Sequence, residues 1–175
     1  MTFLLLAVPP LLQAAPLLAV SAGLQDGRVV AVLDFRWDRP GELLSSLQDG
    51  LESRIVFTAR LYEKRTGLQA IRGDHLLAQS SVVRRAYRDI LTQQYVVVDE
   101  TGARRNEYET AVALLPGFLS VPSLLFPAPV SGTGRLYVTA RAVLEPVLLM
   151  PPLTLVTLVG SAAAYATPWI RSDVP

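Results

Sequence analysis

The stretch that decides the fold is residues 17–37, which read LLAVSAGLQDGRVVAVLDFRW. Two apolar runs, Leu17–Leu24 and Val29–Trp37, flank the short polar stretch Gln25–Arg28, which contains Asp26-Gly27. Asp-Gly between two apolar runs favours a β-hairpin, because glycine adopts a positive φ without a Cβ clash. In the second run every other residue is apolar, and this period of two predicts a strand. The positions that share its apolar face are Val29, Ala31, Leu33, Phe35 and Trp37.

The same alternation recurs farther along the chain. The additional strands are predicted at Arg54–Arg65, Leu76–Arg88, Thr92–Asp99 and Arg135–Glu145. Few of the connections are long helical crossovers, which argues against a parallel doubly wound sheet. The sequence therefore predicts a mainly β or α+β fold, an antiparallel β-sandwich or sheet with two short helices and an apolar C-terminal segment.

The two helices are predicted from changes in hydrophobic period. The first covers Pro40–Asp49, where proline suits the opening turn and Gly50 suits the stop. The second is expected to be capped by Asn106 and to end near Pro116-Gly117. Ser120–Ser131 contains three prolines and is predicted to be an extended loop.

The distribution of charge divides the chain into three parts. The length of 175 residues suits one domain, and 51% hydrophobic residues with only 18% charged ones exclude intrinsic disorder. No charged residue occurs before Asp26 or within 146–170. We therefore expect a signal-peptide-like segment over 1–15, a β-rich domain over 16–145 and an apolar segment over 146–175.

The amino-terminal segment resembles the end of a secretory signal peptide, although a basic start is missing. Its small residues favour cleavage near Ala14 or Ala15, and Val20-Ser21-Ala22 offers a second site. The alternative, a buried first strand, is disfavoured by Pro9-Pro10. We expect the protein to be exported, and to be periplasmic or membrane-associated.

The apolar segment 146–170 allows three interpretations. Its length reaches the roughly 20 residues of a membrane helix, but Pro151-Pro152 divides it. It is therefore a core element, a single membrane anchor, or a site for an apolar partner or ligand. The residues proposed for the last two roles are Leu153, Leu155, Val156, Leu158, Val159 and Trp169.

The charge within the central domain is uneven. Arg54–Arg88 carries eight basic residues against two acidic ones, although the whole chain has a net charge of only +1. One interpretation pairs this segment with its acidic neighbours, and the other gives it a face for an anionic partner. The candidates for that face are Arg60, Arg84 and Arg88. For an exported protein we expect an envelope protein or an anionic lipid surface as the partner, and no nucleic acid.

The sequence offers little for catalysis. His75 is the only histidine and lies in a predicted polar loop, and the chain has no cysteine. A zinc site is therefore not expected. Gly132-Thr133-Gly134 precedes a strand and lacks the lysine of a phosphate-binding loop. We expect no enzymatic activity, no metal and no cofactor.

Several segments in a fixed order resemble a bacterial family. They include Leu24–Arg28, the helix ending in Leu47–Leu51, the strand Ile55–Tyr62 and the stretch Ala86–Val97, which reads AYRDILTQQYVV. With the helix over 108–115 and the strand over 136–141, this layout resembles the family catalogued as domain of unknown function 4390. The resemblance covers about residues 17–145 and implies export or membrane association, without any activity or catalytic residue.

These observations favour a non-enzymatic binding or assembly role at the bacterial cell envelope. The alternative is a carrier that holds an apolar ligand or lipid between its sheet and the C-terminal apolar segment.

Overall fold

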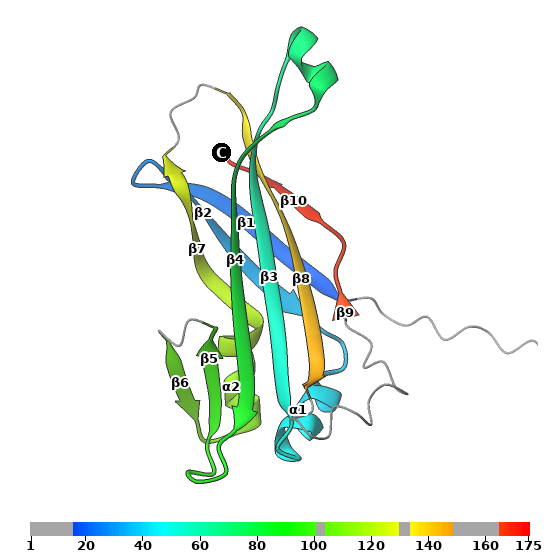
Figure 1. Ribbon diagram of the computed structural model, residues 1–175, viewed down its shortest axis with the longest axis vertical. Helices are drawn as coiled ribbons and strands as arrows, with labels where there is room; N and C mark the ends of the chain where they lie inside the picture. Colours follow the sequence, from blue (N-terminus) through cyan, green and yellow to red (C-terminus); the bar gives the residue numbers. More distant parts are fainter. Residues whose placement is uncertain (1–15, 101–103, 130–133, 149–164) are drawn as a thin grey trace, which may run out of the picture.

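The computed structural model describes residues 16–100, 104–129, 134–148 and 165–175. Two antiparallel sheets pack face to face, so the predicted fold class is confirmed. One sheet has three strands in the order β1-β2-β7, and the other has the order β10-β8-β3-β4-β5-β6, with β9 also paired to β8. The smaller sheet crosses the long strands of the larger one obliquely (Figure 1).

The smaller sheet is built on the predicted hairpin. β1 (Leu17–Gln25) pairs with β2 (Arg28–Arg36) in continuous antiparallel register, which confirms the hairpin. Asp26 and Gly27 between them have φ values of 50° and 71°, as a two-residue turn with both central φ angles positive requires. β7 (Ser120–Pro129) completes this sheet on the other side of β2.

The larger sheet is built on three long strands. These are β3 (Glu52–Glu63), β4 (His75–Arg88) and β8 (Leu136–Leu148), with β3 in the middle. β5 (Tyr95–Asp99) and β6 (Arg105–Tyr108) extend the sheet beyond the lower part of β4, and β9 (Tyr165–Ala166) and β10 (Ile170–Asp173) pair with β8.

Two predictions about local structure are wrong. Ser120–Pro129 forms the edge strand β7 rather than a loop, because at an edge a proline has no ladder hydrogen bond to donate on its open side. The second helix, α2 (Ala111–Leu119), is capped by Thr110, whose Oγ1 accepts from the Ala113 amide at 3.2 Å. Asn106 lies instead in β6, where it pairs with Val97 of β5.

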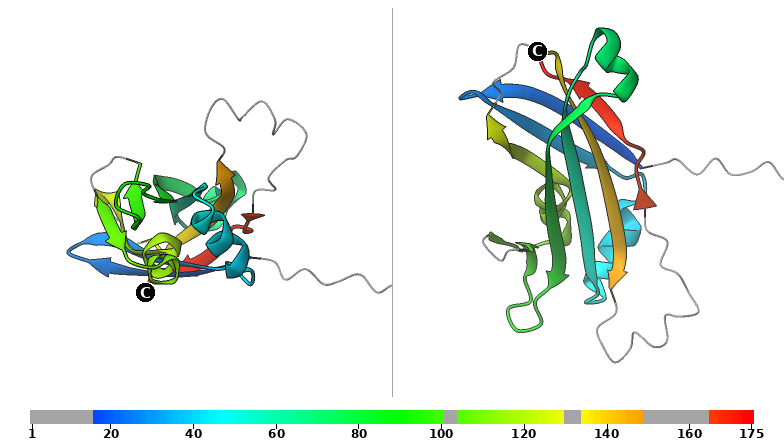
Figure 2. Two further views of the ribbon diagram at one scale, coloured as in Figure 1. Left: turned by 90° about the horizontal axis from the view of Figure 1, so that it is seen from below. Right: turned by 45° about the horizontal axis from the view of Figure 1, so that its top comes forward.

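The first helix and the loop after β3 follow the sequence more closely. α1 (Pro40–Gln48) has proline in its first turn and is followed by Gly50 at a φ of 78°, as predicted. The polar loop between β3 and β4 contains a short 3₁₀ helix, η1 (Gly67–Arg72). η1 lies at one end of the molecule and α1 at the other (Figure 1), and the left-hand view of Figure 2 looks at the end that carries α1.

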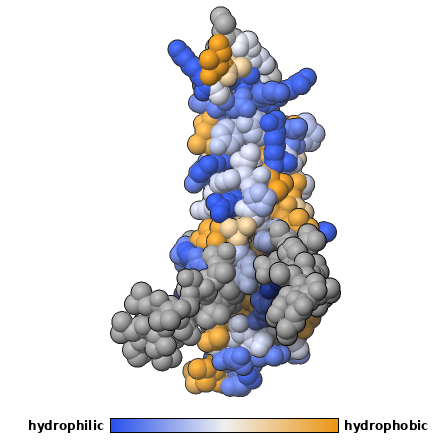
Figure 3. Space-filling model, turned by 90° about the vertical axis from the view of Figure 1, so that its right-hand side faces the viewer, coloured by the Kyte–Doolittle hydropathy of each residue, from blue (hydrophilic) through white to orange (hydrophobic). Residues whose placement is uncertain are grey.

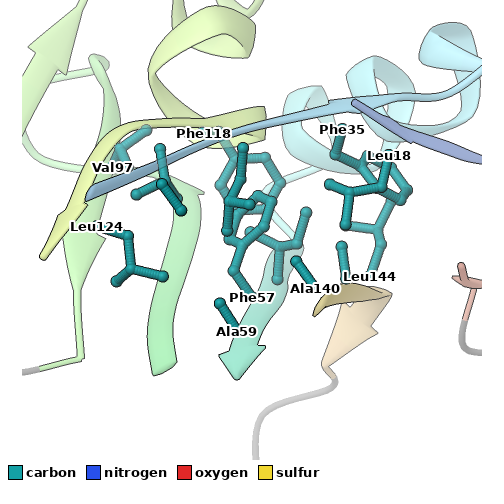
Figure 4. Close-up of a cluster of buried hydrophobic side chains, with 14 of the residues drawn as sticks. Leu18, Phe35, Phe57, Ala59, Val97, Phe118, Leu124, Ala140 and Leu144 are labelled. Atoms are coloured by element: carbon teal, nitrogen blue, oxygen red, sulfur yellow. The ribbon is translucent and has the colours of Figure 1, made fainter. Parts of the chain in front are cut away.

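The core lies between the two sheets and is closed by the helices. Phe35 of β2, Phe57 of β3, Phe118 of α2 and Phe126 of β7 are almost completely buried. Side chains from both layers point toward one another in this core (Figure 4). The alternation predicted for residues 29–37 is confirmed, since every residue of that apolar face is buried.

The last part of the described chain belongs to the same sheet as the central domain. β8 runs across the predicted boundary at 145/146, and Tyr165 and Ile170 pair with Leu144 and Ala140 of β8. Thr167 is 2% exposed, and its Oγ1 accepts from the Ala142 amide at 3.0 Å. In the described part of 146–170, Tyr165, Ala166 and Ile170 therefore belong to the larger sheet and Thr167 is buried, whereas Trp169 is 40% exposed. Among the helices of the described ranges, none is long and apolar enough to cross a membrane.

Candidate aromatic–arginine binding site

A cluster of aromatic and arginine side chains covers the outer face of β3, β8 and β10. Register determines this placement: Tyr62 of β3 is opposite Tyr137 of β8, and Arg60 is opposite Thr139. Thr139 is in turn opposite Arg171 of β10. Directly opposed residues share one face of a sheet, so these side chains form two adjacent rows. We call them, together with Trp169 and with Arg141 opposite Thr58 on the same face, the outer-face site.

Stacking fixes the side chains of the outer-face site. The rings of Tyr62 and Tyr137 are stacked, with centroids 5.2 Å apart and an interplanar angle of 12°. The Arg171 guanidinium carbon lies 3.7 Å from the Tyr137 ring centroid, and that of Arg60 lies 4.4 Å from the Trp169 ring. Cation–π contacts of this kind hold each guanidinium over a ring and reduce the conformational freedom it would lose on binding.

A hydrogen bond to Asp74 fixes the hydroxyl end of the Tyr137 side chain. Tyr137 is 8% exposed and donates to Asp74 Oδ2 at 2.7 Å. Burial, and then this bond to a carboxylate, raise the pKa of Tyr137 to about 12. The same bond, followed by one from the Arg65 amide, lowers the pKa of Asp74 below its ordinary value. Both groups therefore keep their donor and acceptor roles through the neutral pH range.

The outer-face site is an open depression with a volume of about 360 Å³. Arg60, Tyr62, Asp74, Tyr137, Thr139 and Trp169 line it. Trp169 is 40% exposed, so part of its indole is available for contact. Figure 3 views the adjoining side of the molecule, where mostly hydrophilic side chains are interrupted by small hydrophobic groups.

Only some of the positive charges on this face are paired with an acid. Arg171 pairs with Asp173 at 2.9 Å, but the Arg60 side chain bonds to the neutral Gln79 at 3.0 Å. Arg141, opposite Thr58 on the same face, has a buried Nε without a hydrogen-bond partner. Within the described ranges, neither Arg60 nor Arg141 has a carboxylate within salt-bridge distance.

The structure does not bring the three predicted arginines together. Arg84 is opposite Ile55, which points into the core, and Arg84 itself is 7% exposed. The prediction that it lies on an outer face is wrong, because the register with β3 turns Arg84 to the core-facing side. Arg88, four residues farther along β4, lies on this same side, opposite to the face of Arg60. Arg88 Nη2 donates to Gln93 at 2.6 Å, and its guanidinium lies over Tyr95.

Several arginines of the basic segment pair with acidic residues from the neighbouring parts of the chain, as the first interpretation of its charge expected. Arg54 contacts Glu100 and Glu145, and Arg84 contacts Asp99 at 3.2 Å. Arg85 lies 3.6 Å from Glu52. Arg60 is the predicted candidate that reaches the outer-face site.

Trp169 is the other predicted residue in this site. The remaining apolar candidates, Leu153, Leu155, Val156, Leu158 and Val159, lie outside the described residues. Sequence reasoning missed Arg141, Arg171 and Tyr137, because they come from strands outside the basic segment. Tyr137 and Arg141 have odd residue numbers on β8, whereas the even-numbered residues form its apolar face. This alternation could have indicated that both side chains face outward.

Comparison of the chain with models of protein families, with characterised proteins and with solved structures found no match. The resemblance to domain of unknown function 4390 therefore remains a prediction that rests on the segments quoted above.

Proposed function

We propose that this protein is a non-enzymatic binding protein of the bacterial cell envelope that holds an acidic segment of a partner protein at the outer-face site. The observation that carries the proposal is the pair of stacked contacts, Arg60 on Trp169 and Arg171 on Tyr137. Tryptophan, tyrosine and arginine are the residues most enriched in the energetic centres of protein interfaces. The charge-free amino-terminal segment and the family resemblance support an exported location.

The charges of the site favour an acidic partner. Arg60 and Arg141 face outward from adjacent strands, and neither has a carboxylate partner within the described ranges. A guanidinium binds a carboxylate through two parallel hydrogen bonds, which gives both energy and orientation. Thr139 lies between Arg60 and Arg171 and adds a hydroxyl to the depression.

The shape of the site favours a protein segment over a lipid surface. The guanidinium groups are held over rings beside the carboxylates Asp74 and Asp173, rather than forming an even field of positive charge. A partner with shape and charge complementarity satisfies such a mixed surface, whereas an anionic membrane is attracted mainly by net positive charge.

The test measures binding of a fluorescently labelled oligoglutamate peptide, with phosphatidylglycerol and phosphatidylcholine vesicles as parallel probes. We expect the peptide to bind at low salt, and Arg60→Ala and Trp169→Ala each to weaken binding by about tenfold or more. The control is Arg36→Ala, because Arg36 lies on the smaller sheet with its side chain 72% exposed and bonded to Asp34. Arg36→Ala should leave binding unchanged.

Three results would contradict the proposal. They are failure of oligoglutamate to bind, equal losses in the Arg60 and Arg36 variants, and binding confined to phosphatidylglycerol vesicles. The last result would indicate a lipid surface as the partner.

A further inference from the structure

The first part of β4, His75–Val82, lies at an open edge of the larger sheet (upper part of β4 in Figure 1). β5 pairs with β4 only over Arg84–Arg88, and the Glu100 amide adds one bond to the Val83 carbonyl at 2.9 Å. Over His75–Val82, the described strands give β4 a single neighbour, β3. The backbone amide and carbonyl of successive residues in a strand point alternately to its two neighbours. Because the Val83 carbonyl points away from β3, the amides and carbonyls of Ser81 and Gln79 also point to the open side.

This edge lacks the protection that other edges of the molecule have. Residues 75–83 read HLLAQSSVV, with no proline and no Asp, Glu, Lys or Arg. By contrast, the edge strand β7 contains three prolines, and the short edge strands β6 and β10 carry charged side chains. β1 is also uncharged, but it packs beside β10. Long uncharged edges without proline are templates for pairing with another strand.

Two depressions lie along this edge among the described residues. One, of about 280 Å³, lies between β4 and β7 of the other sheet, and the other, of about 170 Å³, lies between Ser81–Val83 of β4 and the end of β5 at Asp99 and Glu100. Val82, Val121 and Pro122 are among the residues that line the larger one. On the core-facing side of β4, Ala78, Ser80 and Val82 are only half-buried, so their inner surface is not fully covered.

We infer that this edge binds an extended segment of a partner protein, which adds to the sheet beside His75–Val82 as a further β-strand. Alternate side chains of the segment meet different surroundings. Those facing inward meet Ala78, Ser80 and Val82, which favours apolar residues. Those facing outward lie beside Gln79 and Ser81, with Arg60 bonded to Gln79, which favours polar or acidic residues.

The register disfavours a second copy of the chain as the occupant. Antiparallel self-pairing centred on Gln79 would bring Asp74 of one copy opposite Arg84 of the other. β5 already pairs with Arg84 on this side of β4, so the chain before His75 of the second copy would collide with Asp99 at the end of β5. A free extended segment can end before this position and avoids the collision.

The experiment uses a synthetic peptide that alternates valine with glutamate and threonine, and a control peptide of the same composition arranged in blocks. We expect the alternating peptide alone to bind and to slow hydrogen exchange at the amides of Gln79 and Ser81. Ser81→Pro removes the open-side amide but no β3–β4 hydrogen bond, and it should weaken binding by about tenfold or more. Ser81→Ala keeps the amide and should bind like the native protein.

A second variant covers the case in which Ser81→Pro fails to fold. Ser80→Lys keeps the backbone and places a charge where the inward side chains of the peptide would lie, so it should also abolish binding. Equal binding of the two peptides, protection of other amides, or a dimer that Ser81→Pro dissociates would each overturn the inference. Since none of these variants alters the outer-face site, failure here leaves the proposed function standing.

Discussion

Arg84 provides a sharp test of the fold, because it is a charged side chain that the core encloses. Its side chain is 9% exposed and its Nε donates to Asp99 Oδ1 at 3.2 Å. Nη1 donates to the Gly117 carbonyl at 2.6 Å and also to the Ser120 carbonyl. Arg84 therefore ties β4 to the end of α2 and the start of β7, which belong to different layers of the structure.

Arg84→Ala leaves Asp99 without its partner and two carbonyls without this donor. Breaking a buried ion pair costs about 3–5 kcal/mol, and a hydrogen bond to a charged group contributes about 1.5–3 kcal/mol. The side chain of Asp99 is 21% exposed and borders an open depression, so water recovers part of this loss. We therefore expect the free energy of unfolding to fall by about 2–4 kcal/mol.

The matched control is the next residue on the same strand. Arg85 points to the outer face, its side chain is 45% exposed and it lies 3.6 Å from Glu52, so Arg85→Ala should cost at most about 1 kcal/mol. Urea unfolding of the full chain, followed by tryptophan fluorescence, measures both values through the shift in midpoint at a common slope. Equal losses for the two variants would refute the assignment of Arg84 to the interior.

Four further predictions concern other parts of the chain. Gly27→Ala should destabilise the protein by about 1 kcal/mol in thermal or urea unfolding, because Gly27 has a φ of 71°. Gly23→Ala should be neutral or slightly stabilising, because an added Cβ there meets nothing within 4 Å. In ultraviolet titration, Asp74→Asn should lower the pKa of Tyr137 from about 12 while burial keeps it above 10.0. Because its pKa is raised in the folded state, Tyr137 stabilises the protein fully below pH 10.0 and loses this contribution as the pH rises through about 12. For an exported protein, amino-terminal sequencing of the periplasmic fraction should give a start before Leu17, because cleavage after residue 22 would remove most of β1.

The sequence by itself determined several of the strands and, in two of them, which side chains face the core. In residues 29–37 and in Arg135–Glu145 one face of the strand is apolar at every position, whereas the other face also carries the polar and charged residues, so the first face is the one that is buried. Asp26-Gly27 likewise determined the first hairpin, since a tight turn of this kind depends on local backbone geometry alone. These features are local, so one segment contains all the information that they require.

Only the tertiary structure decided which polar residues meet. In sequence, Arg84 is one basic residue of a cluster, but β4 turns it inward because Ile55 on the neighbouring strand faces the core. Thr110 rather than Asn106 caps α2, since residues 105–108 are drawn into the sheet by pairing with β5. The outer-face site depends on the registers of β3, β8 and β10, and its members come from segments as distant as Arg60 and Arg171. Register across strands is set by long-range packing of the buried faces, and for that reason no single segment of the sequence reveals it.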